Sequence, residues 1–323
     1  MNSGVDGGEF GVQAQSAKKF HDDMIVGVGK VLVGMHDTVS LAVMALLANG
    51  HILLEGVPGV AKTTLSKVLA RLLGLDSQRI QFTPDLMPQD VTGATVPDRK
   101  SGDWILRKGP VFTNILLADE INRASAKTQS ALLEAMQERQ VSIEGQSLPL
   151  PQPFLVMATQ NPIEQEGVYR LPEAQLDRFL VRIRLDYPGR AKEIEMLSLV
   201  RGETEIPKPI ANAVKIGAWQ ALVDQVVARD VVLEYVVDLA RATREHPMAL
   251  LGASPRAALA VLRMARSRAL CQGRSHVTHE DIQAVAKTVL SHRLIACPEA
   301  ELDGWSGEVI ITEVLASVPV IQA

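Results

Sequence analysis

The feature that most constrains this chain is a short glycine-containing turn between an apolar, strand-like run and a helix-like one. The turn covers residues 56–63 and reads Gly-Val-Pro-Gly-Val-Ala-Lys-Thr. Residues 51–55 before it are largely apolar, and residues 63–73 after it carry leucine and valine at helical spacing. A strand, a glycine turn and a helix in this order favour a parallel sheet covered by helices.

Such a turn is suited to hold the phosphates of a nucleotide. Its glycines let successive N–H groups point at an anion, and the helix N-terminus adds partial positive charge. In the general pattern the lysine reaches the β and γ phosphates and the next hydroxyl binds Mg²⁺, which are the roles expected of Lys62 and Thr63. The expected nucleotide-binding residues of the turn are Gly56, Val57, Pro58, Gly59, Val60, Ala61, Lys62, Thr63 and Thr64.

One position departs from the general GxxxxGK(S/T) pattern, which has glycine where this chain has Ala61. Alanine is tolerated there only with a negative φ, which the start of a helix can provide, and we expect a negative φ at this residue. Taken alone, the turn could also be a glycine-rich connection that holds no ligand.

Size and composition describe a globular protein. The 323 residues are 47% hydrophobic and 22% charged, which is enough for two hydrophobic cores. The net charge of −4 provides no global positive field for nucleic acid or an anionic membrane. The two cysteines fit no metal or disulfide pattern, and the longest apolar stretch, residues 41–54, is too short to span a bilayer. We expect a cytoplasmic protein without direct membrane insertion.

The order of predicted elements divides the chain into three parts. Residues 1–17, rich in Gly, Ser and Gln, predict a flexible lead. Residues 18–187 alternate helix-like and strand-like segments and predict an α/β domain with a parallel sheet. A Pro-Gly step then marks the boundary to residues 188–323, whose helix-period segments predict an all-α domain.

Two further predicted strands end in polar residues that could complete a nucleotide site. The apolar run Ile115–Asp119 is followed by Glu120, and the run from residue 155 leads to Asn161. A parallel sheet brings such strand ends to one edge. We expect Asp119 to hold Mg²⁺ through water, Glu120 to orient or deprotonate the attacking water, and Asn161 to bond the γ phosphate or that water. Each segment could also be an ordinary polar turn.

Four motifs in order resemble the AAA+ ATPases and, within them, the MoxR family. They are the turn at 56–63, Leu-Ala-Asp-Glu-Ile-Asn-Arg at 117–123, Ala-Thr-Gln-Asn-Pro at 158–162 and Leu-Pro-Glu-Ala-Gln-Leu-Asp-Arg-Phe at 171–179. The MoxR group has alanine at the position of Ala61, so this residue no longer counts against nucleotide binding. The resemblance implies an AAA+ nucleotide-binding domain over residues 18–187 and a helical lid over 188–323.

The resemblance also assigns roles that the residues alone do not. Arg178 matches the arginine finger, which enters the active site of a neighbouring subunit. Arg256 matches the sensor-2 arginine of the lid, and whether it acts in its own subunit or the neighbour stays open. Val33 and Gly34 resemble the segment that packs on adenine. Arg178 could instead form a surface ion pair, and Arg256 could be an exposed first-turn arginine.

Two hairpin-like segments, residues 101–110 and 140–150, resemble family insertions that face the central pore or the client. Both could also be ordinary edge hairpins.

Together these features predict a Mg²⁺-dependent ATPase that assembles as a homo-oligomeric ring, expected to be a hexamer, and remodels or matures a protein partner. The resemblance implies a client with a von Willebrand factor A domain, with ATP and Mg²⁺ as cofactors. A nucleic-acid remodelling motor of the same superfamily is an alternative, disfavoured by the low net charge and the 4% aromatic content. An ATP-dependent scaffold without turnover is another, disfavoured by Glu120.

Overall fold

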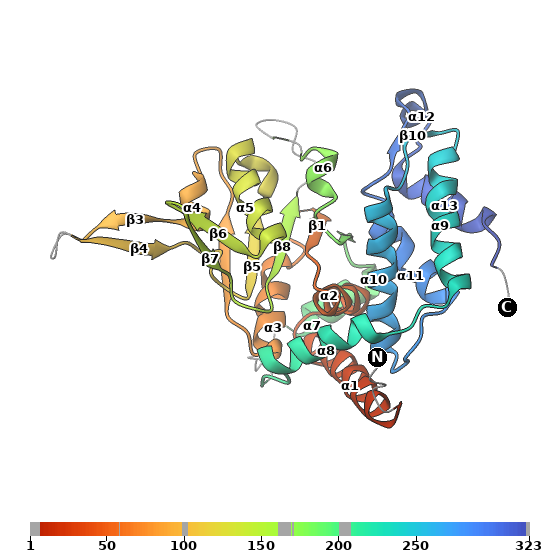
Figure 1. Ribbon diagram of the computed structural model, residues 1–323, viewed down its shortest axis with the longest axis horizontal. Coiled ribbons are helices and arrows are strands. Elements are labelled where there is room, and N and C mark those ends of the chain that lie inside the picture. The colour runs from red at the N-terminus through yellow and green to blue at the C-terminus, as the bar shows by residue number, and fades with distance from the viewer. Residues whose placement is uncertain are drawn as a thin grey trace, which may run out of the picture.

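A five-stranded parallel sheet forms the centre of the N-terminal half of the computed structural model (Figure 1). The structure describes residues 7–57, 59–98, 103–160, 169, 171–199 and 208–320. The strand order is β2-β5-β8-β1-β9, and every neighbouring pair is parallel. The strands are β1 (Ile52–Gly56), β2 (Ser77–Gln81), β5 (Ile115–Asp119), β8 (Leu155–Gln160) and β9 (Val181–Leu185).

Both faces of the sheet are covered, which explains the continuous apolar runs of its inner strands. On one face Leu53, Leu116 and Val156 pack into a core with α5 (Ala126–Glu138) and α4 (Pro88–Thr92). The alternate residues of the same strands pack into a second core with α2 (His36–Leu47) and α3 (Lys62–Leu73). The side-chain period of two along each strand therefore supplies both cores.

The N-terminal segment is helical where a flexible lead is predicted. Helix α1 spans Gly7–Gly29, and Phe10, Ala14 and Ala17 are buried in the core. That prediction is therefore wrong for residues 7–17, while residues 1–6 lie outside the described residues. The physical reason is that these apolar side chains recur every three or four residues and share one helix face, which the Gly, Ser and Gln content conceals.

The part of the chain after β9 is helical, as predicted, and contains only two short strands, β10 (Ala249–Leu251) and β11 (Ile295–Ala296), among its described residues. In Figure 1 α9, α10, α11 and α13 form a group at the blue end of the chain, and α8 contacts α10 of this group as well as α1 and α2. None of the described helices is long and apolar enough to cross a membrane. The division at residue 187 stays a prediction. The helices are α7 (Arg190–Leu199), α8 (Ala213–Gln225), α9 (Asp230–Glu245), α10 (Pro255–Cys271), α11 (His279–Leu290), α12 (Pro298–Leu302) and α13 (Gly307–Ser317).

Two antiparallel hairpins leave the sheet. Strands β3 (Gly93–Pro97) and β4 (Trp104–Lys108) project away from the body in Figure 1. This hairpin starts earlier than the predicted segment 101–110, because β3 supplies its first strand, and residues 99–102 lie outside the described residues. Strands β6 (Gln140–Ile143) and β7 (Gln146–Pro149) occupy the predicted segment 140–150. Their two turn residues both have positive φ, 49° and 79°, as a tight hairpin turn requires.

Candidate nucleotide site

The carboxyl ends of β1, β5 and β8 meet at one edge of the sheet because these strands are parallel neighbours. A cavity of about 370 Å³ opens there, next to the start of α3. This phosphate-loop cavity combines the turn with two acids and with polar residues of β2 and β8. It is lined by Gly59, Val60, Ala61, Lys62, Thr63, Thr64, Arg79, Gln81, Asp119, Glu120 and Thr159.

The turn itself contains two left-handed residues. Gly59 has φ +87°, and Ala61 has φ +56° and ψ 25°. The negative φ expected at Ala61 is therefore wrong: α3 begins one residue later, at Lys62, so Ala61 belongs to the turn and not to the helix. The left-handed conformation costs alanine about 1 kcal/mol, but left-handed residues of this kind turn backbone N–H groups into an anion-binding concavity. Pro58 lies outside the described residues.

Packing against β9 requires the first glycine of the turn. A Cβ atom at Gly56 would lie 2.4 Å from the carbonyl oxygen of Leu185. The side chain of Val60 is buried in the core, and Val57 packs against it. These three residues can therefore offer a nucleotide their backbone atoms only, whereas Thr63 and Thr64 also present hydroxyls to the cavity.

Lys62 is the cation of the turn. Its Nζ donates a hydrogen bond of 2.5 Å to the carbonyl oxygen of Gly56. Burial lowers the pKa of Lys62, while the nearby Asp119 and Glu120 carboxylates act in the opposite direction. The ammonium group thus lies close to both acids of the cavity, where a phosphate would meet it.

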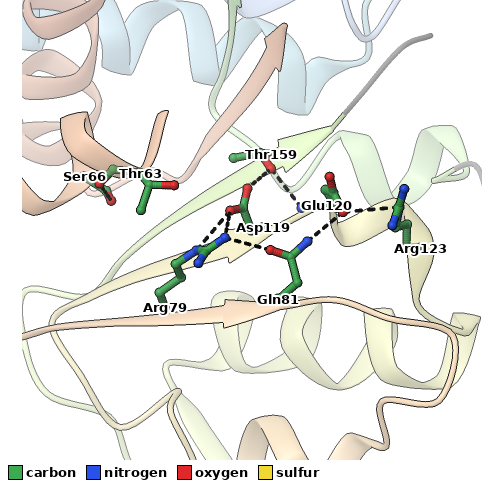
Figure 2. A network of polar contacts seen from close by, with 8 residues as sticks. All are labelled: Thr63, Ser66, Arg79, Gln81, Asp119, Glu120, Arg123 and Thr159. Atoms are coloured by element: carbon green, nitrogen blue, oxygen red, sulfur yellow. Dashed lines mark hydrogen bonds and ion pairs between the residues drawn. The ribbon is translucent and has the colours of Figure 1, made fainter. Parts of the chain in front are cut away.

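Both carboxylate oxygens of Asp119 are engaged (Figure 2). Oδ1 accepts a hydrogen bond of 2.6 Å from the Thr159 hydroxyl. Oδ2 accepts from Arg79 Nε at 3.1 Å and from Arg79 Nη2 at 2.7 Å. The Asp119 residue is only 9% exposed, so its charge is balanced by specific partners and not by bulk water.

Glu120 is held by three groups. Its own backbone N–H donates to the Thr159 hydroxyl oxygen at 2.8 Å. Its Oε2 accepts a 2.6 Å hydrogen bond from Gln81 Nε2 and forms an ion pair of 3.2 Å with Arg123 Nε. Gln81 Oε1 in turn accepts from Arg79 Nη2 at 2.8 Å. A continuous polar chain therefore connects the two acids through β2, as Figure 2 shows.

Arg79, Gln81, Arg123 and Thr159 were not predicted as site residues. Arg79 and Gln81 are two residues apart on β2, and β2 pairs with β5 so that Gln81 lies opposite Asp119. A pair of polar residues at this spacing near a strand end was the one available signal, and it becomes informative only once β2 is known to neighbour β5.

The donor set fits a hard cation that arrives with phosphates. Thr63 and Asp119 offer hydroxyl and carboxylate oxygens, which Mg²⁺ prefers. Within the described part of the chain, no group of three or more His, Cys, Asp or Glu side chains could hold a metal by itself. A magnesium ion here would therefore take further ligands from nucleotide phosphates and water.

Val33 and Gly34 line a second cavity of about 260 Å³ that shares no residue with the first. Apolar side chains of α1 and of the segment before α2, including Val28 and Leu32, form much of its wall. Polar residues of α7 complete it, and the aliphatic part of Lys192 lies directly over Gly34. An apolar wall with a few polar groups suits a planar base.

The two predicted site arginines lie at the opposite edge of the sheet. Arg178 and Arg256 line a third cavity, of about 480 Å³, together with His51 at the start of β1. The five residues of β1 separate this arginine cavity from the phosphate loop by about 17 Å. Among the described residues no hydrogen bond or ion pair engages the Arg178 side chain. The side chain of Arg256 is 62% exposed, and its Nη1 lies 3.9 Å from Asp177 Oδ2.

A buried arginine fixes the segment that carries Arg178. Arg293 Nε donates to Asp177 Oδ1 at 2.6 Å, and its other nitrogens donate to the carbonyl oxygens of Phe179 at 2.7 Å and Leu180 at 3.1 Å. Burial lowers the Arg293 pKa, and the Asp177 carboxylate opposes that effect. Sequence reasoning missed Arg293, because nothing local in the sequence relates it to residues 177–180. Asn161, the remaining predicted site residue, lies outside the described residues.

Comparison with known proteins identifies the class of protein to which this chain belongs. Residues 51–181 match the "ATPase family associated with various cellular activities (AAA)", and residues 241–314 match the "AAA lid domain". A crystal structure of a candidate ATPase from Cytophaga hutchinsonii superposes with a TM-score of 0.89 at 40% identity, covering 96% of this chain and 97% of the other. The protein is thus an ATP-binding ATPase with an α/β AAA+ domain and a helical lid.

Similar proteins identify the family within this class of ATPases. The chain is 46% identical over 295 residues to the uncharacterized protein YeaC of Bacillus subtilis, covering 91% of this chain and 92% of YeaC. It is 44% identical over 307 residues to Chaperone MoxR1 of Mycobacterium tuberculosis, covering 92% and 81% respectively. It is 32% identical over 301 residues to Protein MoxR of Methylorubrum extorquens, covering 85% and 87%. The chain belongs to the MoxR family of AAA+ ATPases.

Proposed function

We propose that this protein hydrolyses Mg²⁺–ATP at an interface between neighbouring copies in a ring, expected to be a hexamer, and uses the reaction for chaperone-like remodelling of a protein client. One observation carries the ring: the phosphate-loop cavity and the arginine cavity lie at opposite edges of the same sheet. A single copy presents an incomplete site at each edge, and a cyclic assembly joins each phosphate loop to a neighbour's arginines.

Within one copy, the residues of the phosphate-loop cavity have complementary roles. The turn and Lys62 bind the phosphates, and Thr63 and Asp119 would hold the magnesium ion. Bound Mg²⁺–ATP supplies the scissile phosphoanhydride bond and a cation that neutralises phosphate charge. Glu120 orients the attacking water and accepts its proton once the carboxylate leaves Gln81 and Arg123. The polar chain through β2 keeps Glu120 in a defined position before that step.

Arg178 and Arg256 supply positive charge to the neighbour's site. Both line the same cavity, so we propose that the lid arginine acts in trans together with Arg178 and not on the phosphates of its own copy. The exposure of Arg256 and the lack of a described partner for the Arg178 side chain support this assignment. Arg293 is a positioning residue, because it fixes Asp177 and the backbone beside Arg178.

A protein client is supported by the name of the Mycobacterium tuberculosis relative, a chaperone. The resemblance to the family adds the proposal that the client carries a von Willebrand factor A domain. On this protein the β3–β4 hairpin offers a contact for it, because Trp104, Ile105 and Leu106 are exposed on a projecting element. We place this work in the cytoplasm, where the two free cysteines, Cys271 and Cys297, stay reduced.

A subunit-mixing experiment tests the shared site. Lys62→Ala and Arg178→Ala are each expected to abolish ATP turnover, by 10³-fold or more for the arginine. An equimolar mixture is expected to regain about a quarter of wild-type turnover, because an active interface needs an intact phosphate loop followed by an intact neighbour arginine. Arg241→Ala, which removes an exposed arginine whose ion pair is with Glu245 of its own helix, is the control and should leave turnover unchanged.

The same mixing assay separates the two positions for Arg256. If Arg256 acts in trans, Arg256→Ala mixed with Lys62→Ala regains turnover; if it acts in its own copy, the mixture stays inactive. Full activity of Arg178→Ala alone would contradict the ring-dependent site. Absence of turnover in the assembled wild type would instead favour an ATP-dependent scaffold.

A further inference from the structure

We propose that Arg79 is a resident counter-ion of Asp119 whose positive charge opposes metal binding, and that Mg²⁺–nucleotide replaces it at Oδ2. This inference rests on the proposed role of Asp119 as a magnesium ligand. It adds a residue of β2 to the metal chemistry of the site and gives that residue a direction of effect: its positive charge opposes metal binding.

The contacts of Asp119 occupy both acceptor sites of Oδ2 and one of the two acceptor sites of Oδ1. Thr159 donates to Oδ1, and two nitrogens of Arg79 donate to Oδ2. A metal ion that uses Oδ2, directly or through water, has to replace Arg79, and one that uses the remaining acceptor site of Oδ1 is bound close to the Arg79 charge. Thr159 is 1% exposed and also accepts from the backbone of Glu120, so it cannot move away without breaking a second contact.

The Arg79 side chain can move away from Asp119, because it is much more exposed than the carboxylate. Its side chain is 48% exposed, against 13% for that of Asp119. It comes from β2, an edge strand of the sheet, and among the described residues one side of this strand has no neighbouring strand. A long side chain on an exposed edge can swing into solvent with little loss of packing. The exchange therefore falls on Arg79, at Oδ2.

The charges around the cavity indicate what the exchange of Arg79 for a metal ion achieves. Lys62 and Arg79 balance Asp119 and Glu120, so the cavity holds its two acids without a metal. A divalent ion alone meets the Arg79 charge, and it has to displace Arg79 to bind Oδ2. The same ion bound to a triphosphate brings additional negative charge and additional ligands. Arg79 thereby disfavours binding of free metal relative to the metal–nucleotide complex.

Metal binding to the full-length protein tests the proposal, with Mn²⁺ as the probe and electron paramagnetic resonance to count the free ion. Titrations are run on the nucleotide-free and on the ADP-loaded protein. Arg79→Gln, which removes the charge and keeps a polar side chain, is expected to bind Mn²⁺ about tenfold more tightly in the nucleotide-free state. Arg79→Lys, which keeps the charge, is expected to stay near wild type. Arg71→Gln, an exposed arginine at the far end of α3, is the matched control.

The outcomes distinguish failure of this inference from failure of the proposed role of Asp119 as a magnesium ligand. Equal or weaker Mn²⁺ binding by folded Arg79→Gln overturns it, because Arg79 would then support the carboxylate and not oppose the metal. Asp119→Asn is expected to weaken Mn²⁺ binding in the ADP-loaded protein. If it does not, Asp119 is no metal ligand and the proposed function loses its magnesium site. If Arg79→Gln fails to fold, Arg79→Ala is titrated in the same way: tighter Mn²⁺ binding than wild type supports the inference, and equal or weaker binding overturns it.

Discussion

His51 makes the stability of the sheet dependent on pH. It lies at the start of β1, is 4% exposed, and joins two neighbouring elements. Its Nε2 donates to the carbonyl oxygen of Met136 at 3.0 Å, and its Nδ1 accepts from the backbone N–H of Val156 at 3.0 Å. This pair of bonds requires the neutral imidazole. Burial, with a further contribution from the Arg139 charge, lowers the His51 pKa to about 4.

The magnitude follows from the two protonation equilibria. In the unfolded chain His51 has the ordinary histidine pKa of 6.5, so below that value the unfolded state binds a proton that the folded state does not accept until about pH 4. The contribution to the free energy of unfolding is fully present above pH 6.5 and falls as the pH decreases. Between pH 7 and pH 5 the loss is about 2 kcal/mol.

Urea unfolding followed by far-ultraviolet circular dichroism measures this loss. Between pH 7 and pH 5 the free energy of unfolding of wild type is expected to fall by about 2 kcal/mol more than that of His51→Gln, whatever the absolute stability of the variant. His21 and His292, whose pKa values are also lowered by burial, are present in both proteins and cancel in the difference. His276→Gln, at an exposed position, should lose as much as wild type. Parallel losses for wild type and His51→Gln would refute the reasoning.

Three further predictions concern the phosphate loop. Because burial lowers the pKa of Lys62, the affinity for an ATP analogue is expected to fall as the pH rises through that lowered pKa. Calorimetric titration from pH 7 to pH 10 should show this fall in affinity for wild type but not for Lys62→Arg. Gly56→Ala should lower the free energy of unfolding by about 2 kcal/mol, since its Cβ meets the carbonyl oxygen of Leu185; unchanged urea denaturation would contradict this. Ala61→Gly should raise the same quantity by about 0.5 kcal/mol, because relief of the left-handed strain outweighs the greater chain entropy of glycine; a loss of stability would show that the alanine is not strained.

Local patterns in the sequence were sufficient for several elements. Strand β5 occupies the predicted residues, Ile115–Asp119, because an uninterrupted apolar run bounded by polar residues has few other ways to be buried. Helix α10, Pro255–Cys271, lies in the part of the chain predicted to be all-α: Ser254 caps it through its side chain, and proline is compatible with the first helical turn. The glycine turn, Lys62 and the two acids at the end of β5 could be assigned to one edge from parallel connectivity alone.

Other features depend on contacts between segments that are distant in the chain. The start of α1 was missed because its composition suggests disorder, whereas burial against the core makes residues 7–17 helical. The positive φ of Ala61 follows from where α3 begins, which no local rule fixed. Arg79 meets Asp119 only because β2 pairs with β5.

By itself, then, the sequence determined the class of fold, the phosphate loop and the acids of one sheet edge, since periodicity, caps and strand ends are properties of neighbouring residues. Only the tertiary structure decided that Arg178 and Arg256 share a cavity at the opposite edge, and that Arg79 neutralises the carboxylate proposed for magnesium. The physical reason is that side-chain partners are set by strand order and by the packing of the lid against the sheet, and neither is written in the spacing of residues along the chain.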